Sequence, residues 1–223
     1  MTVVKFPQST VKNVSAQATF DQQIKLPGDI AMWFFILAEL TVFAVLFLSF
    51  AITEQLYPTL FDQGKQQLHQ VSGLINTIAL ITSSYFVALA VRAMHGSADR
   101  AAPQAQRNAK AVKLLVVALG FACIYLLVKL WEYQALFALG ITIETNTFFT
   151  LYFLITGFHF MHILLGMVIL IYIGFQAKQG AYNESNTDAG QSVNRLSGFE
   201  SGAIYWHMVD LLWIILFPLV YVI

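Results

Sequence analysis

Seven ionisable side chains lie inside long apolar runs of the sequence: Glu39, Lys129, Glu132, His159, His162, His207 and Asp210. A charged group in hydrocarbon costs at least about 2.5–3.5 kcal/mol at the centre of a spanning helix. Such side chains therefore face protein or water, and they often mark proton paths, ion paths or contacts with a partner. These residues are the first candidates for chemistry.

Glu39 is an acid in an apolar run that contains no basic residue. Burial favours the protonated form of a carboxyl group, so Glu39 could exchange a proton near neutral pH. The alternative is a polar contact with another helix or with a partner protein. Both readings stay open, and Glu39 is the candidate buried acid of a proton pathway.

The histidines allow two interpretations. His159 and His162, like His207 and Asp210, are spaced i,i+3 and share a helix face. Hydrogen bonding to neighbouring helices is their simplest role. Three intramembrane histidines are too few for a histidine-rich di-iron site, and a bis-histidine haem needs facing partners that a sequence does not demonstrate. We therefore expect no metal in this chain, with a haem or metal protein as the alternative.

The remaining charged candidates have structural interpretations. Lys129 and Glu132 are expected to neutralise each other, with the flexible Lys129 stem reaching toward the outer membrane surface. Glu200 belongs to the pattern Ser197-x-x-Glu200, which predicts a capping box at the start of a helix.

Composition and hydropathy define the elements that hold these residues. The chain is 58% hydrophobic and only 11% charged, against about 25% charged in soluble domains. A spanning helix needs about 20 apolar residues. Five segments qualify, at residues 30–53, 72–91, 114–139, 148–177 and 203–223. We predict an all-α polytopic membrane protein with five transmembrane helices over residues 30–223, after a polar tail at residues 1–29. The stretch 101–111 is predicted to be a linker with some helical tendency.

Several finer features follow from the pattern. Net charge is zero, which gives no reason to expect a nucleic-acid partner. Residues 144–147 offer helix-capping chemistry before the fourth span. Small residues predict close helix approach, and aromatic residues near the helix ends, Tyr221 among them, predict an interfacial belt. The small residues are Ser83, Ser84, Gly120, Gly157 and Gly166.

The loops also predict orientation. The tail and the second and fourth loops hold ten basic residues, against Lys65 alone in the loops of the other side. Cytoplasmic loops are enriched in Lys and Arg, so the N-terminus is predicted inside and the C-terminus outside. At about 1.5 Å rise per residue, Glu39, His159, His162 and Asp210 fall near the membrane midplane. We therefore expect the polar groups of four helices to share one interior.

Two ordered motifs in the last two spans resemble subunit III of the haem–copper oxidases. One is T-G-F-H-x-x-H-x-x-x-G from Thr156 to Gly166, and the other is E-x-x-x-x-Y-W-H-x-V-D-x-x-W from Glu200 to Trp213. The run around Glu39 resembles that family's helix with a buried acid, and Glu132-Tyr133 matches its middle helix. The resemblance extends from about Pro27 to Ile223.

This resemblance implies a non-catalytic accessory subunit of a respiratory terminal oxidase, itself without a redox centre. Haem and copper would lie in partner subunits I and II, and this chain would pack on subunit I, support proton uptake and bind phospholipid. Glu39 would be the buried acid near subunit I. The polar framework around the interior and lipid cleft would be Glu132, His159, His162, Glu200, His207 and Asp210. A bacterial inner membrane is the expected location.

Departures from the family leave the catalytic partner open. The mitochondrial form has seven spans, and this chain lacks the first two. Residues 76–85 of its second span are similar to a branch associated with bacterial nitric oxide reductases. The partner could be a cytochrome c oxidase, a quinol oxidase or a nitric oxide reductase. A small transporter using Glu39 and Asp210 is a further alternative, but the paired halves typical of transporters are not apparent.

Overall fold

The computed structural model describes residues 30–95, 103–180, 182 and 189–222, with side chains in the last segment described from residue 197. The described residues form six helices and no strand, as the all-α prediction requires. Five of these helices are long and apolar enough to cross a membrane, which confirms the predicted spans. The predicted tail, residues 1–29, lies outside the described residues. The helices are α2 (Ile30–Leu56), α3 (Pro58–Gln66), α4 (Gln70–Met94), α5 (Gln104–Ala138), α6 (Thr147–Lys178) and α7 (Ala189–Tyr221).

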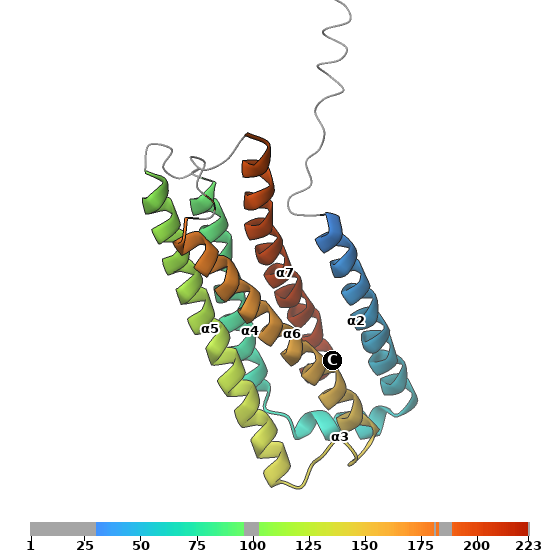
Figure 1. Cartoon of the computed structure of the whole chain (residues 1–223). Helices are drawn as coiled ribbons and strands as arrows, with labels where there is room; N and C mark the ends of the chain where they lie inside the picture. The colour runs from blue at the N-terminus through green and yellow to red at the C-terminus, as the bar shows by residue number, and fades with distance from the viewer. Residues whose placement is uncertain (1–29, 96–102, 181, 183–188, 223) are drawn as a thin grey trace, which may run out of the picture.

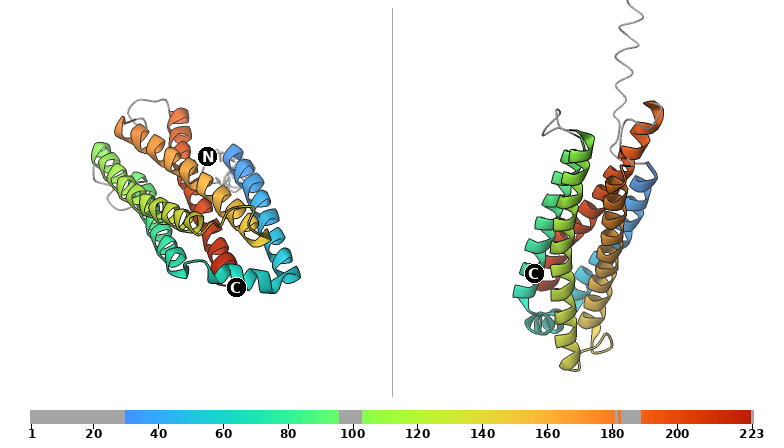
Figure 2. Two further views of the ribbon diagram at one scale, coloured as in Figure 1. Left: turned by 90° about the horizontal axis from the view of Figure 1, so that it is seen from below. Right: turned by 60° about the vertical axis from the view of Figure 1, so that its left-hand side comes forward.

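The five long helices run alternately up and down (Figure 1). Helices α4 and α5 pack along each other on one side of the bundle, and α6 and α7 occupy its middle. Helix α2 lies on the opposite side, where it contacts α6 and α7 (Figure 2). Helices α6 and α7 therefore each touch three other spans, and together they form the centre of the bundle.

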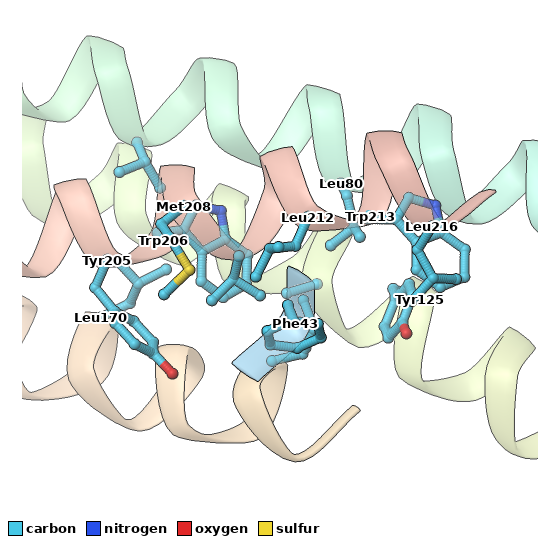
Figure 3. Packing of buried hydrophobic residues seen from close by; sticks show 14 of the residues in the cluster. Phe43, Leu80, Tyr125, Leu170, Tyr205, Trp206, Met208, Leu212, Trp213 and Leu216 are labelled. Atoms are coloured by element: carbon cyan, nitrogen blue, oxygen red, sulfur yellow. The ribbon is translucent and has the colours of Figure 1, made fainter. Parts of the chain in front are cut away.

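Aromatic and aliphatic side chains from every span fill the core. Trp206 and Trp213 of α7 are almost completely buried, and Tyr125 of α5 and Phe43 of α2 pack in the same interior (Figure 3). The outer faces are apolar as well, as Phe34 on α2 illustrates. This distribution suits a helix bundle whose solvent is lipid, because water does not force polar residues outward.

Close helix approach occurs at some of the small residues only. Ser83 donates a hydrogen bond to the Ala118 carbonyl across the α4–α5 contact, at 2.9 Å. A Cβ on Gly166 would lie 2.9 Å from the Trp206 ring, so α6 and α7 meet tightly there. The prediction is wrong for Gly120 and Gly157, because a Cβ on either would meet no atom within 4 Å.

The helix boundaries confirm the predicted cap of α6, and they correct the predicted linker and the predicted capping box at Glu200. The Asn146 side chain accepts a hydrogen bond from the Phe149 amide at 2.9 Å and caps α6. The linker prediction is wrong for residues 104–111, since α5 begins at Gln104, directly after Pro103, and the helical tendency expected of this stretch is confirmed. Its Ala, Gln, Arg and Lys residues all favour helix, which explains the extension. The capping box at Glu200 is also wrong, because α7 begins at Ala189.

The short helix α3 is an element that hydropathy did not predict. Pro58 occupies its first turn, where a missing amide proton costs nothing. Phe61 of α3 is fully buried and its ring packs on Phe50 and Phe148, with centroids at 5.0 and 5.2 Å. Lys65 pairs with Glu54 of α2. Helix α3 thus covers one end of the bundle, and Glu54 of α2 neutralises its lysine.

Candidate functional site

Glu39 finds its partner on another helix. Its Oε2 atom lies 2.9 Å from Nε2 of His162 on α6, while Nδ1 of that histidine contacts the Phe158 carbonyl at 2.8 Å. A carbonyl only accepts, so Nδ1 carries a proton. Nε2 then either accepts the proton of a neutral Glu39 or donates one to the carboxylate. The pair can therefore hold a proton on either side of one hydrogen bond.

The surroundings of this pair are apolar on one side and partly open on the other. The Phe43 and Phe158 rings lie 5.2 and 4.6 Å from the His162 ring. The Glu39 side chain is 20% exposed and that of His162 is 9% exposed. Glu39 is thus the more accessible member of the pair, although most of its side chain is covered.

Lys129 and Glu132 form the most deeply buried charged group of the described residues. The exposed fraction of Lys129 is 0% and that of Glu132 is 1%. The Lys129 ammonium donates to Glu132 at 3.2 Å, to Tyr152 at 3.0 Å and to Tyr221 at 2.7 Å. Both tyrosine hydroxyls donate to the Glu132 carboxylate, at 2.8–3.1 Å. All three ammonium protons and both carboxylate oxygens are thereby paired.

Four aromatic rings complete the enclosure of the ammonium group. Ring centroids lie 4.8–5.7 Å from Lys129 Nζ, within the range of cation–π attraction, and belong to Tyr133, Tyr152, Trp213 and Tyr221. The predicted reach of Lys129 toward the membrane surface is therefore wrong. So is the assignment of Tyr221 to an interfacial belt, because this residue is 1% exposed. Enclosure by rings and hydroxyls replaces the water that the ammonium would otherwise seek.

His159 lies in an aromatic box without a hydrogen bond from any described residue. Its ring is fully buried, with Trp213 at 5.2 Å, Tyr125 at 5.9 Å and Phe43 at 6.3 Å between centroids. Both ring nitrogens are buried without a protein partner among the described residues. Although His159 and His162 share a helix, their environments differ, and only His162 meets an acid.

Two polar residues in the middle of α7, His207 and Asp210, contact Ser84 of α4. His207 Nδ1 lies 2.6 Å from the Ser84 hydroxyl. The carboxylate of Asp210, one turn further along, also interacts with Ser84. About two turns before His207 on α7, Glu200 pairs with His95 at 2.8 Å. Glu200 is therefore an inter-helix contact, and His95 is a partner that the sequence reading missed.

The candidate residues form separate contacts rather than one hydrogen-bonded centre. They pair as Glu39 with His162, Lys129 with Glu132, His207 and Asp210 with Ser84, and Glu200 with His95. Among the residues that the structure describes, no group of three or more His, Cys, Asp or Glu side chains is arranged to hold a metal ion. The arrangement can tie helices together and can hold a proton at Glu39.

Sequence comparison relates this geometry to known proteins. The sequence model of the family described as cytochrome c oxidase subunit III matches residues 2–223. The chain belongs to the cytochrome c oxidase subunit III family. The resemblance seen in the two motifs is thereby confirmed. Several motif residues of α6 and α7 meet neighbouring helices, among them His162, Gly166, Glu200 and His207.

Individual members of the family show the range of its complexes. Cytochrome c oxidase subunit 3 of Synechocystis sp. is 29% identical over 188 residues, 84% of this chain and 72% of the relative. Cytochrome bo(3) ubiquinol oxidase subunit 3 of Buchnera aphidicola is 26% identical and covers 96% of this chain and 94% of its own. Heme-copper oxidase subunit I+III of Aeropyrum pernix is 27% identical over 96% of this chain and 25% of its own.

Proposed function

We propose that this chain is the non-catalytic subunit III of a haem–copper respiratory oxidase in a bacterial cytoplasmic membrane. The family match over residues 2–223 carries the proposal. The Aeropyrum relative supports docking on the catalytic subunit, because its name joins subunits I and III. Haem and copper are assigned to partner subunits I and II, and no redox cofactor is assigned to this chain.

The proposed orientation has the N-terminus inside and the C-terminus outside. Several basic residues lie where α4 ends, α5 begins and α6 ends, which is one face of the bundle: Arg92, Arg107, Lys110, Lys113 and Lys178. At the opposite face, Lys65 pairs with Glu54. The positive-inside tendency assigns the first face to the cytoplasm.

Glu39 and His162 supply the chemistry of the proposed role in proton uptake. A carboxyl group that shares a proton with an imidazole, and is partly exposed, can pass that proton to water or to a partner subunit. Glu132 and His159 are fully enclosed and serve as framework. Glu200 and His207 line a cavity of about 260 Å³ between α4 and α7, which is the place proposed for a phospholipid within the polar framework.

Purification in mild detergent through a tag on the N-terminal tail tests the proposal. Subunit masses and visible absorption spectra are measured for the complex and for the separated chain. Haem in the complex and none in the separated chain is expected. Haem or metal retained by the separated chain would overturn the assignment and make the histidines the ligands to test.

A quinol oxidase is the second candidate, favoured by the Buchnera relative. The copurified subunits separate the candidates, because a copper-bearing subunit II is expected for a cytochrome c oxidase. Nitric oxide reductase subunits in the preparation would instead identify the partner as that enzyme.

A further inference from the structure

A second cavity lies between α5 and α6, away from the polar framework. Its volume is about 450 Å³, and it is lined by Ala105, Asn108, Ala109, Val112, Lys113, Lys178, Gln179 and Gly180. The start of α5 and the end of α6 lie side by side at this end of the bundle (Figure 1). The cavity takes one lysine from each helix.

The depth of the cavity follows from the polarity of both helices. Helix α5 is polar from Gln104 to Lys113 and apolar from Leu114 onward. Helix α6 is apolar up to Phe175 and then ends at Lys178. A Cβ on Gly174 would touch Leu115 at 3.5 Å, so the two apolar segments meet just beneath the cavity. The cavity therefore lies at the boundary between hydrocarbon and lipid headgroups.

The charge of the cavity favours an anion. Lys113 and Lys178 are both exposed, and no Asp or Glu is among the described residues that line the site. The exposed amide of Gln179 adds a further donor. Ammonium groups at this depth attract acidic headgroups, because the surface potential acts within a Debye length of the membrane.

Apolar surface continues from the cavity toward the bilayer. Val116 lies one helical turn beyond the lining residue Val112, on the same face of α5, and is exposed. Phe175 lies one turn before Lys178 on α6, and is also exposed. A ligand with a charged head and apolar tails would meet matching surface along its whole length.

We propose that this cavity binds the headgroup of an anionic phospholipid, with Lys113 and Lys178 contacting its phosphate and the acyl chains lying along α5 and α6. The site rests on the membrane placement of the chain and not on which catalytic subunits accompany it. It is separate from the cavity at Glu200 and His207, which is lined by α4 and α7.

The test measures lipid retained by the tagged chain, with whatever subunits it carries, after transfer to nanodiscs of phosphatidylcholine with a minor fraction of phosphatidylglycerol. Native mass spectrometry counts each bound lipid. Phosphatidylglycerol affinity is expected to fall about fivefold in Lys113→Gln or Lys178→Gln and about thirtyfold in the double variant. Lys110→Gln is the matched control, because Lys110 is exposed on the same helix but does not line the cavity.

Three results would overturn the proposal. Equal losses in Lys110→Gln and in the cavity variants would show a general surface attraction. Unchanged retention in the double variant would show that the lysines do not hold the headgroup. Displacement of the bound lipid by excess inorganic phosphate would show a site for free anions. Because retention is measured on whatever assembly copurifies, each result is independent of that assembly's identity.

Discussion

Glu39 could act through its exchangeable proton or only through its hydrogen bond to His162. Glutamine can keep the hydrogen bond, because its amide N–H can donate to His162 Nε2, which lies 2.9 Å from Oε2 of Glu39, but the amide cannot release a proton. Glu39→Gln is expected to leave assembly intact and to alter proton uptake or to hasten inactivation during turnover. Activity of the purified complex is followed over many turnovers.

The control for this variant is Glu144→Gln, which removes an exposed acid in the loop before α6. It is expected to behave as the native chain. Native activity over many turnovers in assembled Glu39→Gln would refute the proton role and leave Glu39 as an inter-helix contact.

The enclosed pair of Lys129 and Glu132 makes a different prediction. Removing one charge from a buried pair leaves the other uncompensated, which costs about 3–5 kcal/mol, while removing both is often close to neutral. Glu132→Gln is therefore expected to lower thermal stability and subunit yield strongly. The double variant Lys129→Met, Glu132→Gln is expected to recover most of the loss, as measured by unfolding in one detergent. Equal instability of the single and double variants would mean that the hydrogen bonds to tyrosine, not the charges, hold the cluster.

The five transmembrane helices could be predicted from the sequence, but several of their ends and their contacts with one another could not. Hydrocarbon demands about 20 apolar residues, so the spans are visible in sequence alone. Hydropathy does not detect the first turns of α5, because these residues are polar and precede the apolar run that begins at Leu114. Hydropathy also misses helix α3, because its nine residues have mixed polarity and resemble a loop in sequence. The packing of Phe61 on Phe148 is apparent only in the structure.

The same limit applies to the candidate site. Spacing within one helix shows which residues share a face, and the motifs located the polar positions of α6 and α7 correctly. Pairing across helices depends on register and rotation, which a single sequence does not contain. The contacts of Glu39 with His162 and of Glu200 with His95 each join two helices, so neither could be predicted.

Helix approach between α6 and α7 gives a prediction with a matched control. A methyl group on Gly166 would meet the Trp206 ring at 2.9 and 3.1 Å, and overpacking of this kind costs about 1–3 kcal/mol. Gly166→Ala is expected to lower the thermal midpoint. Gly157→Ala, on the same helix with open space around it, is expected to be neutral or to stabilise by up to about 1 kcal/mol. Similar midpoints for the two variants would show that Trp206 yields to the added methyl group.

Contacts between the helices divide the bundle into a closely packed group, α4 to α7, and a more loosely attached helix, α2. Helices α4 and α5 pack extensively on each other and on the α6–α7 pair, whereas α2 touches only α3, α6 and α7 strongly. Much of α2 is therefore left to lipid or to a partner, and Glu39 lies on this least enclosed span. The proposed proton exchange at Glu39 would therefore take place at the edge of the subunit, whereas Lys129 and His159 at its centre are sealed among aromatic rings.

The membrane orientation is the last prediction, and it decides which compartment Glu39 and the lysine-lined cavity serve. In a Cys123→Ser background, Ile143→Cys places a thiol on the exposed loop between α5 and α6, and Gln106→Cys places one in the first turn of α5. If basic residues set the topology, a membrane-impermeant thiol reagent labels the Ile143→Cys chain in spheroplasts, whereas the Gln106→Cys chain reacts only after lysis. The reverse pattern would place Lys113 and Lys178 on the outside of the membrane. A proton taken up from the cytoplasm could not then enter at the end of the bundle where these lysines lie.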